Sequence, residues 1–112
     1  MGFSPIRQFQ RYAVQLLAIA VSASPRLDHV HNLSKSGARI SSRAAPEAGS
    51  PYTFLLIIPG TATRAQVLKL PAKVVWTATG EFGVRFDAQD AGLDRFVDQL
   101  AEQVEPANVT RA

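Results

Sequence analysis

The strongest constraint on the fold is a series of short segments rich in β-branched and aromatic residues, each followed by a turn signal. Pro25, Gly37, Gly60 and Gly80 mark four of these turns. Short strands with turns about every 8–12 residues are typical of an antiparallel sandwich or barrel, so the sequence predicts an all-β core. The predicted strands are 12–21, 26–32, 38–41, 52–58, 66–77 and 82–86.

Some of these strands carry more specific expectations. The first, 12–21, is apolar almost throughout, which predicts burial on much of both of its faces. Proline cannot donate to a strand ladder, so Pro71 predicts a bend or bulge within 66–77. The aromatic residues Trp76, Phe82 and Phe86 are expected in the core.

One helix is expected after the strands. Leu93, Phe96, Val97 and Leu100 are spaced for one apolar helical face, and Asp90 is a suitable N-cap. Pro106 is expected to end this helix. We therefore assign residues 12–104 to the domain and 105–112 to a tail.

Composition narrows the possible functions. The chain has 112 residues, enough for one domain with a modest core. It contains no cysteine, which excludes disulfides, thiolate nucleophiles and zinc–thiolate sites. No run of 18 apolar residues is present, so no membrane insertion is expected.

The positive charge is concentrated in the first half of the chain. Residues 1–50 contain six Lys and Arg against two Asp and Glu, whereas residues 51–112 contain six against seven. A basic half favours an anionic ligand, although a solvated surface gives the same pattern.

Two motifs lie in this basic half. Arg7 and Arg11 are four residues apart, a spacing that puts both guanidinium groups on one side of a strand or a helical turn. The segment Asn32–Gly37 predicts a turn between two strands. Asn32 and Ser34 can hydrogen-bond to a ligand or to the turn backbone, and Gly37 allows a positive φ or a close approach.

In this order, the two motifs resemble the signature of the PilZ family, RxxxR followed by (D/N)xSxxG. Lys73–Trp76 and Gly83–Phe86 also resemble strands of that family. The resemblance implies a small antiparallel six-stranded β-barrel with a C-terminal α-helix. It also implies a cytoplasmic, non-enzymatic receptor for cyclic di-GMP that acts on a partner protein in motility, polysaccharide or pilus machinery.

The same resemblance identifies the ligand-binding residues. They are Arg7, Arg11, Asn32, Ser34 and Gly37. No further cofactor, metal or nucleic-acid polymer is expected. Residues 1–11 contain Pro5 and few apolar anchors, so we expect a mobile segment that closes over the ligand. Whether the nucleotide binds as a monomer or as an intercalated dimer stays open.

Two alternatives remain at this stage. The chain could be a PilZ-like adaptor that works through protein contacts without nucleotide. Alternatively, two arginines, an apolar run and a small-residue segment at 22–24 resemble a secretory signal peptide, which would make the protein a small secreted β-protein.

Other chemistries lack support. His29 and His31 flank Val30, but a metal site needs three or four ligands. Asp94 and Asp98 fit the polar face of a helix better than a catalytic pair. There is no G-x-S-x-G elbow and no phosphate-binding glycine loop.

Overall fold

The computed structural model describes the backbone of residues 10–21, 25–60 and 66–110, with the side chains of the helix described as far as Glu102. Six strands precede one helix. Their bounds are β1 (Tyr12–Ala20), β2 (Arg26–Leu33), β3 (Gly37–Ser41), β4 (Pro51–Ile58), β5 (Gln66–Ala78), β6 (Glu81–Phe86) and α1 (Ala91–Thr110).

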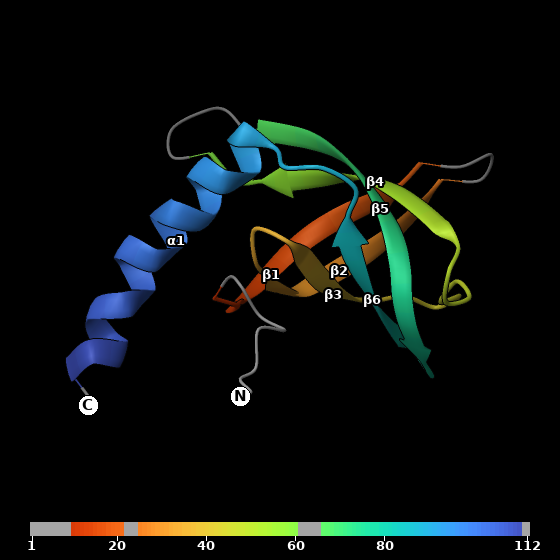
Figure 1. Ribbon diagram of the computed structural model, residues 1–112, viewed down its shortest axis with the longest axis horizontal. Helices are drawn as coiled ribbons and strands as arrows, with labels where there is room; N and C mark the ends of the chain where they lie inside the picture. The colour runs from red at the N-terminus through yellow and green to blue at the C-terminus, as the bar shows by residue number, and fades with distance from the viewer. Residues whose placement is uncertain (1–9, 22–24, 61–65, 111–112) are drawn as a thin grey trace, which may run out of the picture.

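The strands form a closed antiparallel barrel in the order β1-β2-β3-β6-β5-β4. Pairing of β1 with β4 completes the closure, and α1 runs beside one end of the barrel (Figure 1). The predicted six-stranded barrel with a C-terminal helix is confirmed. None of the helices in the described part of the chain is long and apolar enough to cross a bilayer.

Alternate residues of each strand point inward and form one core. Its largest buried side chains include Phe54, Phe82 and Leu33. From α1, Leu93 and Val97 join the same cluster, and Phe96 and Leu100 pack against it. The helix therefore covers the core with the apolar face that its sequence spacing predicts.

The expectation that β1 is buried on both faces is wrong. Its burial alternates, and Leu17 is 39% exposed although its neighbours Leu16 and Ala18 are buried. The reason is that β1 belongs to a barrel with a single sheet layer, so nothing in the described chain covers its outer face.

The bulge in β5 also differs from the prediction. The strand runs through Pro71 without a change of register, and the irregularity lies between Val74 and Trp76. Pro71 is tolerated because β6 ends at Phe86, opposite Ala72, so Pro71 lies beyond the β5–β6 ladder.

This bulge explains why Trp76 is not in the core. Trp76 is 37% exposed, and it pairs in register with Gly83 of β6. A Cβ atom on Gly83 would collide with the Trp76 indole, so the ring covers the space that the missing side chain leaves. Phe82 and Phe86 are buried, as predicted.

The helix begins as expected but ends later. The Asp90 carboxylate accepts a hydrogen bond from the Leu93 amide at 2.9 Å, which confirms the N-cap. However, α1 continues through Pro106 to Thr110, so the expected tail at 105–112 is wrong as far as Thr110. A proline inside a helix removes one backbone hydrogen bond and can bend the helix without ending it.

A buried polar group lies between β2 and β4. The Tyr52 hydroxyl donates to Asp28 Oδ2 at 2.7 Å, and Arg26 Nε donates to Asp28 Oδ1 at 3.1 Å. Burial, together with the hydrogen bond to Asp28, raises the pKa of Tyr52 above its usual range. The phenol therefore stays protonated and remains a donor to the buried carboxylate.

We expect Tyr52→Phe to lower the free energy of unfolding by about 1–3 kcal/mol, because Asp28 would lose a donor in a buried position. Urea unfolding measures the change. Tyr12→Phe is the matched control, since the Tyr12 hydroxyl has no hydrogen bond to a described residue. Equal stability of the two variants would contradict a stabilising role for the Tyr52–Asp28 bond.

Candidate functional site

The turn between β2 and β3, which we call the signature turn (Asn32–Gly37), is organised by Ser34. The Ser34 amide donates to the Gly37 carbonyl at 2.9 Å. The Ser34 hydroxyl accepts hydrogen bonds from the amides of Ser36 and Gly37, each at 3.1 Å. Since Ser34 is 2% exposed, its hydroxyl serves the turn backbone, one of the two roles expected for it.

Gly37 is required for a close approach and not for a positive φ. Among the described glycines, only Gly49 and Gly80 have a positive φ. Gly37 pairs with Arg85 of β6, and a Cβ atom at this position would collide with the Val84 carbonyl oxygen. The alternative of a left-handed conformation at Gly37 is therefore wrong. The close approach that requires glycine is to the backbone of β6, and the approach of Gly37 to a bound group stays a prediction.

Asn32 differs from Ser34 because its side chain is not used by the turn. It pairs with the exposed Ala13 on one side and with the exposed Arg39 on the other. Its Oδ1 atom is nevertheless buried, and it has no hydrogen-bond partner in the described part of the chain. A buried acceptor without a partner is unfavourable, so this oxygen is suited to a donor from a neighbouring segment or a ligand.

The two motifs meet at one end of the barrel. Arg11 is exposed and directly precedes β1, whose first residue, Tyr12, pairs with Leu33 in the signature turn. The end of the RxxxR segment therefore lies next to Asn32–Gly37. Arg7 and the predicted mobility of residues 1–9 lie outside the described residues.

The sequence did not predict the neighbours of Asn32 on the outer surface. Register places Asn32, Arg39 and Gly83 side by side on β2, β3 and β6, with Trp76 of β5 covering Gly83. Arg39 lies 3.7 Å from Glu81, and its side chain is 45% exposed. This row adds a cation and an aromatic ring to the surface beside the signature turn.

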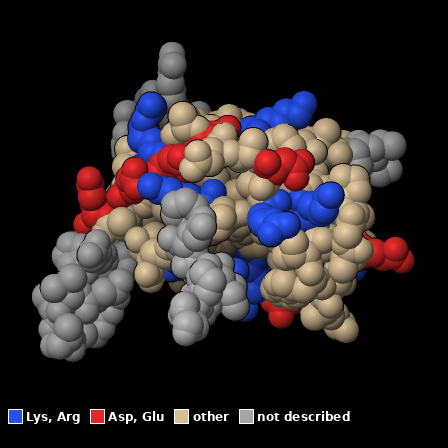
Figure 2. Space-filling view, viewed as in Figure 1, with Lys and Arg blue, Asp and Glu red and all other residues tan. Residues whose placement is uncertain are grey.

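Lys35, at the tip of the signature turn, is a second residue that the sequence did not single out. Its ammonium group lies 2.8 Å from Asp98 Oδ1 of α1. Figure 2 shows Lys and Arg side chains beside Asp and Glu where α1 meets the barrel. Asp98 therefore pairs with a cation, and Asp94 has a buried Oδ1 atom without a described partner. The polar helix face predicted for these two residues is thus only partly exposed to solvent.

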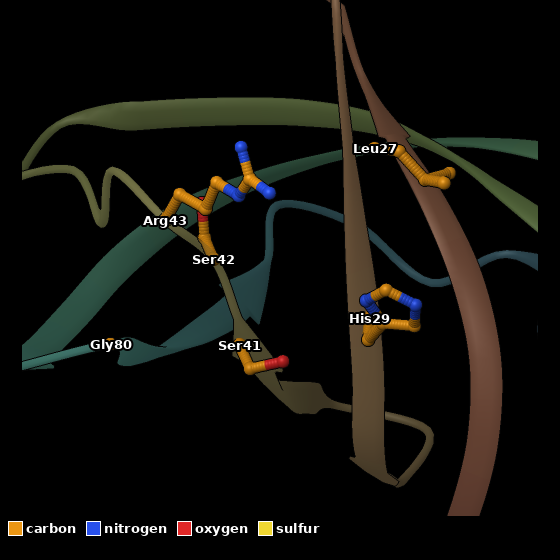
Figure 3. Close-up of a pocket in the computed structure, with 6 residues that line it drawn as sticks. All are labelled: Leu27, His29, Ser41, Ser42, Arg43 and Gly80. Carbon is orange, nitrogen blue, oxygen red and sulfur yellow. The ribbon is translucent and has the colours of Figure 1, made fainter.

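A separate depression of about 330 Å³ lies at the opposite ends of β2 and β3 (Figure 3). Its lining residues are Leu27, His29, Ser41, Ser42, Arg43 and Gly80. Nearby, His31 Nε2 hydrogen-bonds to Ser41 Oγ at 2.8 Å. No cluster of three or more possible metal ligands occurs among the described residues. Because none of the signature residues lines this depression, the signature end is the better candidate site.

The comparisons with known proteins agree with this geometry. The model of the PilZ domain family matches residues 5–103, which covers most of the chain. The fold and the motif arrangement define a small six-stranded barrel domain with a C-terminal helix. The chain belongs to the PilZ family. A search of curated proteins gave no match.

The solved structures that share the fold with this chain include two from bacteria. One is the inhibitor of motility MotI/DgrA from Bacillus subtilis, with a TM-score of 0.77 and 13% identity over 90% of this chain and 52% of that one. The other is the PilZ domain of CeSA from a cellulose-synthesizing bacterium, with a TM-score of 0.60 and 18% identity over 86% and 98%. The chain thus spans about half the length of MotI/DgrA.

We expect Gly37→Ala to destabilise the protein by about 1–3 kcal/mol, because the new methyl group would force β3 away from the β6 backbone. Thermal or urea unfolding measures this effect. Gly83→Ala is the matched control, because there the obstacle is the partly exposed Trp76 side chain, which can move aside. If Gly37→Ala is no more destabilising than Gly83→Ala, the close strand approach does not explain the glycine.

Proposed function

We propose that this PilZ domain is a receptor for cyclic di-GMP. The observation that supports the proposal best is the closeness of the two parts of the family signature. Tyr12, which follows Arg11, pairs with Leu33 of the signature turn. This turn carries the predicted ligand-binding residues Asn32, Ser34 and Gly37. A nucleotide seated on this turn is therefore within reach of the RxxxR segment.

The chemistry of these side chains suits a cyclic dinucleotide. An arginine fork binds the O6 and N7 atoms of guanine or a phosphate oxygen, and its plane stacks on a base. In the proposed complex Arg7 and Arg11 take these roles. Asn32 Oδ1, which lacks a described partner, accepts a hydrogen bond from an arginine or a guanine amine. Ser34 and Gly37 fix the shape of the surface on which the ligand rests.

The output of the receptor is a changed surface. The RxxxR segment closes over the nucleotide, and its contacts with the ligand offset the backbone entropy lost on ordering, about 1–2 kcal/mol per residue. A partner protein then binds the altered surface. The names of the two structural neighbours, an inhibitor of motility and a PilZ domain from a cellulose-synthesizing bacterium, suggest cytoplasmic motility or polysaccharide machinery as the setting. The module itself is not an enzyme.

The second candidate is an adaptor that binds proteins without nucleotide. The specific observation in its favour is Ser34, whose hydroxyl is engaged by the turn backbone. In an adaptor, the signature would serve the turn alone. Asn32 favours the receptor, because its oxygen contributes nothing to the turn.

Isothermal titration calorimetry with cyclic di-GMP tests the receptor. We expect binding by the wild-type protein, and Arg7→Ala and Arg11→Ala should each weaken it by about 1–3 kcal/mol if each makes a bidentate guanine contact. Arg43→Ala, in the distant depression, is the matched control and should bind normally.

Selectivity completes this test. Cyclic di-AMP should bind much more weakly, because adenine presents a donor where guanine presents the O6 acceptor. Equal affinity for the two dinucleotides would limit recognition to phosphate. Absence of cyclic di-GMP binding by the folded wild-type protein would favour the adaptor.

A further inference from the structure

A direct polar link joins the candidate nucleotide site to the helix. Lys35, at the tip of the signature turn, reaches across to α1 and contacts Asp98 at 2.8 Å. Figure 1 shows the β2–β3 turn beside the middle of α1. Any ligand that attracts the Lys35 ammonium group therefore acts on a contact that also positions the helix.

The turn holds the backbone of Lys35 in place. Ser34, on one side, is bound to Gly37 through its amide and its hydroxyl. Ser36, on the other side, accepts a hydrogen bond from the Phe86 amide of β6 at 2.9 Å through its carbonyl. The position of the Lys35 Cα atom is thus fixed, and the long side chain is the part that can change partners.

Lys35 stays protonated in the folded protein. Its hydrogen bond to Asp98 raises its pKa and outweighs the opposing effect of partial desolvation, and the charge of Asp94 acts in the same direction. Lys35 is therefore a cation at neutral pH, and it can pair with a carboxylate or with a phosphate.

The balance between these two partners favours phosphate. The Lys35 side chain is 26% exposed, but its partner Asp98 lies largely in solvent, so water and salt weaken the pair. The Asp98 side chain is 63% exposed, so water can solvate its carboxylate when Lys35 leaves. A cyclic dinucleotide carries two phosphates, and a charge-assisted hydrogen bond to one of them is stronger than a neutral bond.

Loss of the contact has a local consequence for α1. The first two turns remain attached through the buried Leu93 and Val97. From Asp98 onward the helix would lose its polar contact with the signature turn and keep the packing of Leu100 against the core. A bound phosphate would also repel the carboxylates of Asp94 and Asp98. The part of α1 around Asp98 then moves more freely against the barrel.

We propose that Lys35 is a nucleotide-binding residue that exchanges the Asp98 carboxylate for a ligand phosphate and so couples nucleotide binding to α1. This inference rests on the proposed binding of cyclic di-GMP. It adds a ligand contact beyond the family signature, and it assigns α1 as an element that responds to the ligand.

Substitutions of the two partners in this contact, Asp98 and Lys35, should change the affinity for cyclic di-GMP in opposite directions. Asp98→Asn should bind cyclic di-GMP about two- to fivefold more tightly, because Lys35 no longer has to leave a carboxylate. Lys35→Gln should bind about tenfold more weakly, whereas Lys35→Arg should keep most of the affinity. In the double variant, Asp98→Asn should improve the affinity less than it does beside Lys35, because only the repulsion between Asp98 and the phosphate is relieved.

Glu102→Gln is the matched control for charge. It removes one negative charge from α1, four residues beyond Asp98, but Glu102 has no contact with Lys35. Its affinity should stay within about twofold of the wild type, since exposed charges without contact are screened. Melting curves of the free variants establish that each one is folded before binding is compared.

Amide hydrogen exchange measures whether α1 becomes more mobile when the nucleotide binds. Cyclic di-GMP should accelerate exchange in α1 near Asp98 in the wild-type protein, but not in Lys35→Gln at saturating ligand. If wild type binds the nucleotide but Asp98→Asn is not tighter, or Lys35→Gln is unaffected, the exchange model is wrong and the receptor stands. If wild type fails to bind cyclic di-GMP, the proposed receptor itself fails.

Discussion

The close approach of β3 to β6 at Gly37 is the constraint on which the architecture of the site depends. It allows the ladder between these strands to begin directly after the turn, with Gly37 opposite Arg85 and Ala38 opposite Val84. This ladder joins β1, β2 and β3 to β6, β5 and β4, and together with the β1–β4 pairing it closes the barrel. One small residue therefore serves both the closure of the sheet and the shape of the turn.

Around this residue, the signature separates into parts with different physical tasks. Ser34 is buried and satisfies the turn backbone, whereas Asn32 retains an acceptor without a described partner. Lys35, between Ser34 and Ser36, contacts the helix. The sequence predicts one ligand-binding loop at Asn32–Gly37. In the structure this segment is a hydrogen-bonded turn in which Asn32 is available to a ligand and Lys35 contacts the helix.

Much of the fold was predictable because it follows from local patterns. The strand segments, the Gly80 turn, the Asp90 cap and the apolar face of α1 each depend on neighbouring residues. The errors arose where pairing between distant strands decides the outcome. The exposure of Leu17 depends on a barrel with a single layer, and the position of Trp76 depends on a bulge.

The same distinction applies to the site. Its motif residues could be named from the sequence, but their tasks could not, because Gly37 is defined by a β6 carbonyl and Ser34 by its burial. Lys35 and Asp98 are separated by more than sixty positions in the sequence, so neither marks the other as a partner. Arg39 joins the surface only through its register with Asn32.

The length of α1 has a mechanical consequence. Figure 1 shows the second half of the helix extending beyond the barrel. Its 20 residues span about 30 Å at about 1.5 Å per residue, and its apolar anchors lie near the capped end. The helix is therefore a lever with its pivot at the barrel. Its second half, about 15 Å long, would carry its far end through about 3 Å on a tilt of about 10°. Such a lever converts a change the size of one side-chain contact into a displacement of about half a helical turn.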